Sequence, residues 1–332
     1  MYKKLGKIKS WNTYQSMIEI WVEKSLGEDY YELPKRGNTK YKGEDIIPFW
    51  KNFQVLGPTM KVAGTYIGSD KLGHFFHEGY TYFDKVHKYL DKEENFSVDD
   101  QEMWPSEADM STEVGHKFES GIQGVKTTGV YSFADLEANA SGYSFYLDIF
   151  RDPSKTFSIR SYMKEFGAEK VGPNAMEGKT LDSKRTSWNE ERNSNFYRDD
   201  MAKIVWKNIL SNKWIGIDEQ QKNNLQDFEL SLKSGKNDTI SGKLSLLNTV
   251  SNQKQFYELN QATIEYIEGN PFKKPQENNK HTLIRGIKIE GLLDSNQKIT
   301  ILSRGETKLK AYLRNRKEGN SVNKIITFIK QN

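Results

Sequence analysis

Hydrophobic residues recur at helical spacing through much of the first two thirds of the chain. Trp11–Ser25 is amphipathic, and Asp70–Lys92 carries apolar side chains three and four residues apart, which predicts a long helix. Ser106–Asp109 and Ser132–Asp135 each place a serine three residues before an aspartate, a pattern typical of a helix N-terminus. The second of these helices is expected to run to Phe150, and a further helix is expected within residues 187–214.

The last third of the chain alternates between apolar and polar positions, which favours strands. Phe228–Leu232 and Ile240–Leu247 flank a turn-rich segment and predict a hairpin. Gln255–Glu268 is predicted as a single helix in this part. Further strands are predicted at Thr282–Leu293, Lys298–Ser303, Lys308–Leu313 and Asn323–Lys330.

The composition changes near Trp214. All seven tryptophans precede residue 218, and residues 218–332 contain 19 Lys and Arg against 13 Asp and Glu, a net charge of +6. The first 217 residues contain 30 against 32, a net charge of −2. We therefore predict two domains, a mainly helical one at 1–217 and a basic, β-rich accessory domain at 218–332. The predicted fold class is α+β.

Composition excludes several classes of protein. A 332-residue chain with 36% hydrophobic and 12% aromatic residues can bury a sizeable core. The net charge of +4 gives no indication of nucleic-acid binding. No cysteine is present, which excludes disulfides and thiolate metal sites. No apolar run reaches the roughly 18 residues of a membrane span, and Glu19 and Glu23 interrupt the apolar run that a signal peptide would need.

Candidate chemistry is concentrated around Glu119. A helix is expected to end near Phe118, and Gly121, Gly124 and Gly129 then interrupt the chain before Ser132, which predicts a short hairpin or an irregular loop. A carboxyl group at a helix C-terminus faces the negative end of the helix dipole, which should raise its pKa as a general acid requires. The alternative is that Glu119 is an ordinary solvated carboxylate.

Several motifs resemble those of known wall-degrading enzymes. Glu119-Ser-Gly121 followed by Gln123-Gly124 is similar to family-23 lytic transglycosylases, although the spacing is shorter and their Gly-Leu-Met-Gln signature is absent. Asp70-Lys-Leu-Gly-His-Phe-Phe76 and Thr128–Asn139 resemble a group of lysozyme-like enzymes of predatory bacteria that cut deacetylated peptidoglycan. The likeness covers about residues 65–150.

This resemblance implies a lysozyme-like helical domain that hydrolyses β-1,4 bonds of peptidoglycan or a related aminosugar polymer. Its catalytic pair would fall on Glu119 and Tyr131. Asp135 is a further catalytic candidate, as the group that activates water, and a helix cap is its alternative role. Tyr131 has the alternative of packing beneath the loop. Thr128, Asn139 and His74 are the candidate substrate-binding residues, and Asn139 has the alternative of bridging helices.

A rival interpretation uses histidines. Asp70, His74 and His77 share a helix face, and two histidines three residues apart could bind a metal together with Glu113, His116 or Glu119. The spacing differs from the His-Glu-x-x-His of zinc peptidases. The motif is also faintly similar to VanZ-like membrane proteins, without their spans.

We expect no metal and no cofactor; a metal-dependent hydrolase and a non-enzymatic interaction protein remain alternatives. Oligomeric state and location stay open, and action on a cell wall would require delivery to the periplasm or outside the cell.

Overall fold

The structure is a computed structural model that describes only part of the chain. The described residues are 59–62, 65–90, 105–106, 110, 114–121, 124–154, 158–163, 188, 195–218, 226–235, 238–248, 253–271, 282–303, 308–317 and 321–330. The described residues up to Asn195 form one compact unit, and those from Phe196 onward form a second. The prediction for Trp11–Ser25 lies outside the described residues, as do most residues of the helix predicted to begin at Ser106.

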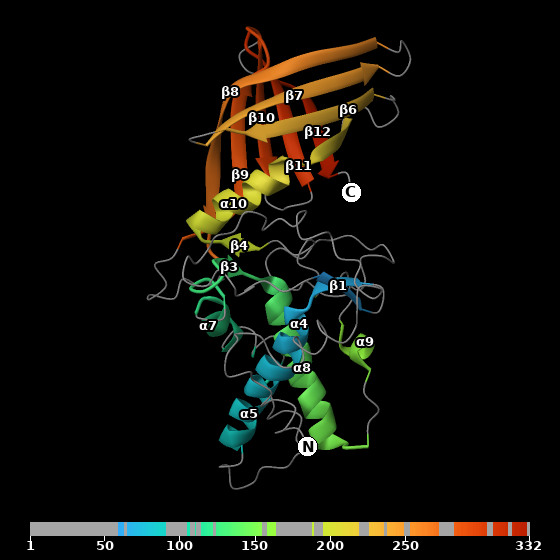
Figure 1. The fold of residues 1–332 in the computed structure, drawn as a ribbon, viewed down its shortest axis with the longest axis vertical. Helices are drawn as coiled ribbons and strands as arrows, with labels where there is room; N and C mark the ends of the chain where they lie inside the picture. The colour runs from blue at the N-terminus through green and yellow to red at the C-terminus, as the bar shows by residue number, and fades with distance from the viewer. Residues whose placement is uncertain are drawn as a thin grey trace. The chain divides into compact units, whose positions relative to one another are not determined.

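The first unit is built around two long helical segments (Figure 1). The first segment is continuous from Asp70 to Leu90, as the sequence pattern predicts, and the second begins one residue after Ser132. Antiparallel strands β1 and β2 precede the first segment. The elements of this unit are β1 (Thr59–Val62), β2 (Thr65–Gly68), α4 (Asp70–Gly73), the π-helical turn η2 (His74–Glu78), α5 (Gly79–Leu90), α7 (His116–Glu119), β3 (Val130–Tyr131), α8 (Phe133–Arg151) and α9 (Ile159–Tyr162).

Two glycines allow these helical segments to meet backbone to backbone. A Cβ atom at Gly79 would lie 2.5 Å from the carbonyl carbon of Gly142, and a Cβ atom at Gly142 would overlap the carbonyl oxygen of Phe75. Around this crossing the core is aromatic, and Phe75 and Trp188 lie with ring centroids 5.2 Å apart. The close approach places η2 directly beside α8, and both segments carry candidate site residues.

The second unit is a closed barrel of eight antiparallel strands in chain order (Figure 1). Each strand pairs with the next, and β12 pairs back with β5 through Ile326↔Asp218 and its neighbours. The short β4 (Phe196–Tyr197) adds to β9, and helix α10 (Asp199–Leu210) packs against β4, β6 and β9. The barrel strands are β5 (Lys213–Asp218), β6 (Gln226–Ser234), β7 (Thr239–Asn248), β8 (Gln253–Gly269), β9 (Leu283–Leu292), β10 (Gln297–Ser303), β11 (Lys308–Asn315) and β12 (Ser321–Lys330).

Side-chain alternation gives each strand of the barrel one buried face and one partly exposed face. Along β9, Ile287 and Ile289 are fully buried, whereas the residue that follows each of them, Lys288 and Glu290, is partly exposed. The same period of two appears in β10, where Ile299 and Ile301 are buried. One face of each strand therefore fills the interior, and closure leaves the ring of eight strands without a free edge.

The predicted fold class is wrong. More of the described residues lie in strands than in helices, and the closed barrel overturns the expected architecture of a mainly helical lysozyme-like domain followed by a smaller β-rich domain. Gln255–Glu268, predicted as a helix, lies within strand β8. Its residues suit a helix or a strand locally, and pairing with β7 and β9 selects the strand.

Of the two alternatives predicted for the segment after Glu119, the described residues form an irregular loop and not a hairpin. Residues 124–129 form consecutive turns, with the Val125 N–H donating to the Glu119 carbonyl at 2.7 Å and the Gly129 N–H to the Val125 carbonyl at 3.1 Å. These local hydrogen bonds satisfy the backbone without a strand partner. Only Val130 and Tyr131, at the end of the segment, are extended as β3.

The predicted domain boundary lies inside an element of the barrel. Strand β5 runs through residues 217 and 218, whereas the division between the two compact units falls at Asn195 and Phe196. Which segment folds by itself stays a prediction. None of the helices in the described part of the chain combines the length and the apolar character that a membrane span needs.

Candidate functional site

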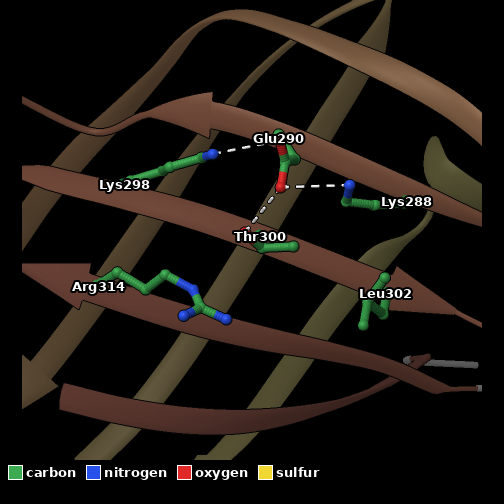
Figure 2. Close-up of a pocket in the computed structure, with 6 residues that line it drawn as sticks. All are labelled: Lys288, Glu290, Lys298, Thr300, Leu302 and Arg314. Atoms are coloured by element: carbon green, nitrogen blue, oxygen red, sulfur yellow. Dashed lines mark hydrogen bonds and ion pairs between the residues drawn. The ribbon is translucent and has the colours of Figure 1, made fainter. Parts of the chain in front are cut away.

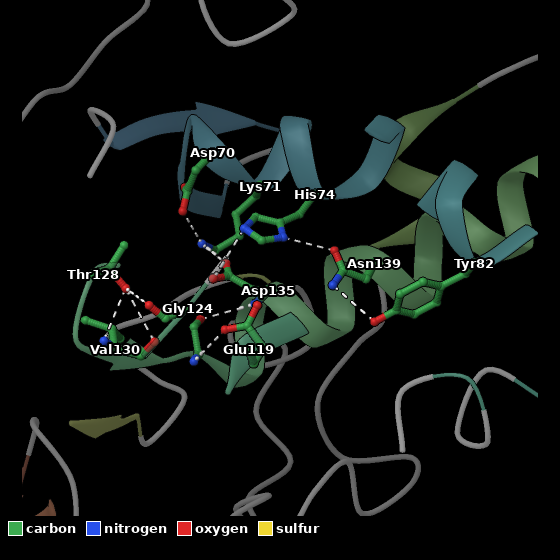
Figure 3. Close-up of polar contacts among 11 residues, drawn as sticks. Asp70, Lys71, His74, Tyr82, Glu119, Gly124, Thr128, Val130, Asp135 and Asn139 are labelled. Carbon is green, nitrogen blue, oxygen red and sulfur yellow. Dashed lines mark hydrogen bonds and ion pairs between the residues drawn. The ribbon is translucent and has the colours of Figure 1, made fainter. Parts of the chain in front are cut away.

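Charged side chains from α4, η2 and α8 meet in one cluster in the first unit (Figure 3). We define this charged cluster as Asp70, Lys71, His74 and Asp135. The oxygen and nitrogen atoms that Asp70, His74 and Asp135 offer all lie within 4.8 Å of one another. The side chains of these three residues are 21%, 14% and 10% exposed, so the cluster reaches the surface.

Lys71 joins the two aspartates. Its ammonium nitrogen lies 2.8 Å from Asp70 Oδ2 and also forms an ion pair with Asp135 Oδ1, while its side chain is fully buried. A buried cation of this kind needs nearby carboxylates, because burial removes the water that would otherwise solvate it. The lysine therefore binds the start of α4 to the start of α8.

His74 lies between two polar partners on α8. Its Nε2 is 3.4 Å from Asp135 Oδ2, and its Nδ1 is 3.0 Å from Asn139 Oδ1. Burial lowers the pKa of His74, but the carboxylate of Asp135, helped by Asp70 and Glu78, outweighs burial and the charge of Lys71, so the pKa is raised above 6.5. His74 therefore has an increased tendency to carry a positive charge.

Asn139 continues the network into the core. Its Nδ2 donates to the hydroxyl of Tyr82 at 3.1 Å, and both residues are fully buried. In this orientation the amide oxygen faces His74, so Nδ1 of His74 is the donor in their hydrogen bond. This bridge between helices is the role that the sequence left open for Asn139 beside substrate binding, which stays a prediction.

Asp135 has two separable roles. Its backbone N–H donates to Ser132 Oγ at 3.2 Å, so Ser132 caps α8 as the sequence pattern predicts. Its carboxylate instead turns towards Lys71 and His74. The side chain is therefore not used for capping and is available for chemistry in the charged cluster.

Glu119 lies in a different setting from the one expected. Its side chain is fully buried, and its Oε2 accepts a hydrogen bond from the backbone N–H of Ser132 at 3.2 Å. The carboxylate therefore faces the positive N-terminal end of α8, where a negative charge is stabilised. Gly124 is required beside it, because a Cβ atom there would overlap the Glu119 carbonyl oxygen. The catalytic role of Glu119 stays a prediction.

Tyr131 is also fully buried, and its hydroxyl contacts Nδ1 of His116. Burial raises the pKa of the tyrosine hydroxyl, with a smaller contribution from Glu119, and burial lowers the pKa of His116 to about 4. Near neutral pH, His116 is therefore uncharged and the tyrosine keeps its proton. The burial of Tyr131 agrees with the packing role that the sequence offered as the alternative to catalysis.

Thr128 stabilises the turn that leads into β3. Its hydroxyl donates to the Gly124 carbonyl at 3.0 Å and accepts from the Val130 N–H at 3.2 Å. Both contacts are local, and the role of Thr128 in binding substrate stays a prediction.

A metal would compete with Lys71 in the charged cluster. Asp70, His74 and Asp135 have the donor atoms to bind a divalent cation, but the Lys71 ammonium already pairs with both carboxylates. His77, which the metal-dependent rival pairs with His74, has its Nε2 3.5 Å from Glu78 Oε1. The geometry thus groups His74 with two aspartates rather than with His77.

Sequence reasoning missed Lys71 and the contact between Tyr131 and His116. Lys71 stands inside the motif Asp70–Phe76, and its place directly after Asp70 was the only local signal in the sequence. The contact between His116 and Tyr131 joins residues 15 positions apart and has no local signature. Comparisons of the chain with family models, curated proteins and solved structures gave no match.

Proposed function

We propose that the first unit is a glycoside hydrolase for an aminosugar polymer such as peptidoglycan, and that its acid–base chemistry takes place in the charged cluster. The observation that carries the proposal is the pairing of His74 with Asp135, whose Nε2 and Oδ2 atoms lie 3.4 Å apart in a partly exposed setting. A histidine paired with a carboxylate is a common arrangement for proton transfer.

The choice of substrate is supported by the motifs. The two segments that resemble lysozyme-like enzymes, Asp70–Phe76 and Thr128–Asn139, are the segments whose side chains meet in the charged cluster. Two motifs whose side chains also meet in one site support a common role more strongly than either motif does alone.

In this proposal His74 is the proton donor. Its raised pKa increases the fraction of imidazole that carries a proton, and this proton passes to the oxygen of the leaving sugar as the glycosidic bond breaks. Asp70 has the most exposed side chain of the cluster, and its carboxylate lies within 4.8 Å of the imidazole nitrogen of His74, near the roughly 5–5.5 Å of retaining glycosidases. Its oxygen therefore attacks the anomeric carbon as the leaving oxygen takes the proton, and water then hydrolyses the glycosyl ester while His74 takes back a proton. Lys71 and Asp135 hold the two groups in position.

Glu119 and Tyr131 have positioning roles in this proposal. Both side chains are fully buried, so a general acid in the position of Glu119 would have no direct contact with a polymer. Glu119 instead fixes the start of α8, and with it the position of Asp135, through its hydrogen bond to the Ser132 N–H.

A second candidate function is a non-enzymatic interaction protein in which the cluster only joins helices. The observation that favours it is the pairing of Lys71 with both aspartates, which neutralises much of the charge that catalysis would use. In that case the parent chain would have no activity, and substitutions in the cluster would change only stability.

Digestion of purified sacculi, followed by release of soluble sugar fragments, tests the proposal. General acid catalysis contributes about 10²–10⁴-fold, so we expect His74→Gln and Asp70→Asn to lose most activity. His77→Gln is the matched control, because His77 belongs to the same π-helical turn as His74 and its Nε2 lies 3.5 Å from Glu78 Oε1. Wild-type activity in His74→Gln would exclude the proposed donor, and failure of the parent chain to digest any glycan would favour the second candidate.

Glu119→Gln separates the two catalytic assignments. If Glu119 only positions α8, this substitution should reduce activity in proportion to its effect on stability. If it abolishes cleavage while the melting temperature is unchanged, the general acid is Glu119 and the assignment of His74 is wrong.

A further inference from the structure

An open hollow of about 430 Å³ lies on the barrel wall across β9, β10 and β11 (Figure 2). Alternation along the strands places its lining side chains on the outside, because their neighbours Ile287, Ile289, Ile299 and Ile301 are buried. The lining residues are Lys288, Glu290, Lys298, Thr300, Leu302 and Arg314. Three cationic side chains and one carboxylate give the lining a net charge of +2.

Two of these cations lie opposite each other on neighbouring strands, where antiparallel sheets usually favour opposite charges. Lys298 and Arg314 are direct register partners on β10 and β11. Like charges directly opposite each other on antiparallel strands are destabilising, and an opposite charge at either position would be favoured for stability alone. The hollow therefore brings together two adjacent positive groups that an anionic ligand can contact.

Glu290 partly compensates this charge. Its carboxylate lies 3.4 Å from the ammonium of Lys288 and 3.2 Å from that of Lys298. Burial would raise the pKa of Glu290, but these two lysines outweigh burial and keep the pKa below its ordinary value. Glu290 is therefore ionised at neutral pH and competes with any anion for the same lysines.

We propose that this hollow is a binding site for an oxyanion, a phosphate or carboxylate group of a small molecule or polymer. Arginine suits such groups because its planar guanidinium can donate two parallel hydrogen bonds. The Thr300 residue is 6% exposed and forms part of the floor between the cations and Glu290. The proposal does not depend on glycan hydrolysis by the first unit.

The barrel contains an internal control for this site. Glu229 is bridged by Lys213 at 3.2 Å and by Lys254 at 3.4 Å, which repeats the arrangement around Glu290 with a second carboxylate and two more lysines. The lining of the hollow includes Arg314, whereas neither Glu229 nor its two lysines belongs to that lining. A response specific to the hollow should therefore appear at Glu290 and not at Glu229.

Titration calorimetry of the full chain with inorganic phosphate at low, matched ionic strength tests the proposal. Hydrogen bonds to charged groups contribute enough that Arg314→Gln should weaken phosphate binding about tenfold. Glu290→Gln should strengthen it by a similar factor, because a competing carboxylate is removed. Glu229→Gln and Lys213→Gln should change it less than twofold.

Titration with acetate in place of phosphate distinguishes the two sources of the anion. Tighter binding of phosphate would assign a phosphate ligand to the site, and tighter binding of acetate would assign a carboxylate. Absence of binding of both anions to the parent chain and to Glu290→Gln would overturn the proposal. Equal effects of Glu290→Gln and Glu229→Gln would also overturn it, because they would show attraction to the net charge of the barrel and not to the hollow.

Discussion

Nδ1 of His74 lies 3.0 Å from the amide oxygen of Asn139, although the two residues are 65 positions apart in the chain. Together with Asp135, which lies on the other side of the imidazole, Asn139 offers His74 an oxygen acceptor at each ring nitrogen. Two acceptors favour the doubly protonated ring, in agreement with the raised pKa of His74.

This relationship predicts that stability depends on pH through His74. A group whose pKa is raised on folding contributes stability that is fully present below its unfolded pKa, about 6.5, and is lost as the pH rises through the higher folded value. Urea unfolding between pH 6 and pH 9 should therefore show a decline for the parent chain. His74→Gln should show a smaller decline, and equal slopes for the two chains would contradict the prediction.

The free energy of unfolding should also depend on pH through Glu137, over a lower pH range than for His74. Burial raises its pKa from 4.5 to about 7, so its contribution to stability is present below pH 4.5 and lost as the pH rises to about 7. Glu137→Gln removes the cost of the buried charge and should stabilise the chain at pH 8, by at most about 3 kcal/mol. Urea unfolding at pH 4.5 and pH 8 measures this, and a destabilised variant at pH 8 would show that the carboxylate is needed there.

Lys71→Met should be strongly destabilising. It leaves the carboxylates of Asp70 and Asp135 without their shared cation, and loss of one partner from a buried ion pair typically costs about 3–5 kcal/mol. Lys88→Met is the control, because Lys88 pairs with Asp84 at 2.6 Å but its side chain is 70% exposed, and such pairs contribute less than about 1 kcal/mol. Equal losses in denaturant unfolding would exclude a special role for Lys71.

Gly142→Ala should disrupt the crossing of α8 with η2. The added Cβ atom would overlap the carbonyl oxygen of Phe75, so the two helical segments would have to separate. We expect the free energy of unfolding to fall by about 1–3 kcal/mol, the usual cost of overpacking. If His74 and Asp135 act together in catalysis, activity should fall as well. Lys207→Ala, at an exposed position of α10, should leave the melting temperature nearly unchanged.

The closed barrel predicts which segment folds alone. A chain of residues 196–332 keeps all eight strands and α10, whereas a chain of 218–332 lacks nearly all of β5 and leaves unpaired edges on β6 and β12. We expect the longer chain to unfold cooperatively and the shorter one to aggregate. Circular dichroism and size-exclusion chromatography measure this, and a stable 218–332 chain would support the boundary predicted from composition.

Local patterns determined much of the secondary structure. The serine cap at Ser132, the helical segment beginning at Asp70 and most barrel strands follow from side-chain spacing, because spacing decides which face of an element can be buried. The same reasoning failed at Gln255–Glu268, whose residues suit either state locally. Its pairing with β7 and β9 selected the strand.

The sequence by itself also identified the residues around which the candidate site is built, since His74, Asp135 and Asn139 stand in recognisable motifs. Only the tertiary structure decided how they are used. It buried Glu119 against the start of α8, brought Lys71 between two aspartates and closed eight strands into a barrel. Such contacts join residues far apart in the chain, and their energies depend on burial and on charges supplied by other elements. Neither quantity is encoded in the spacing of neighbouring residues.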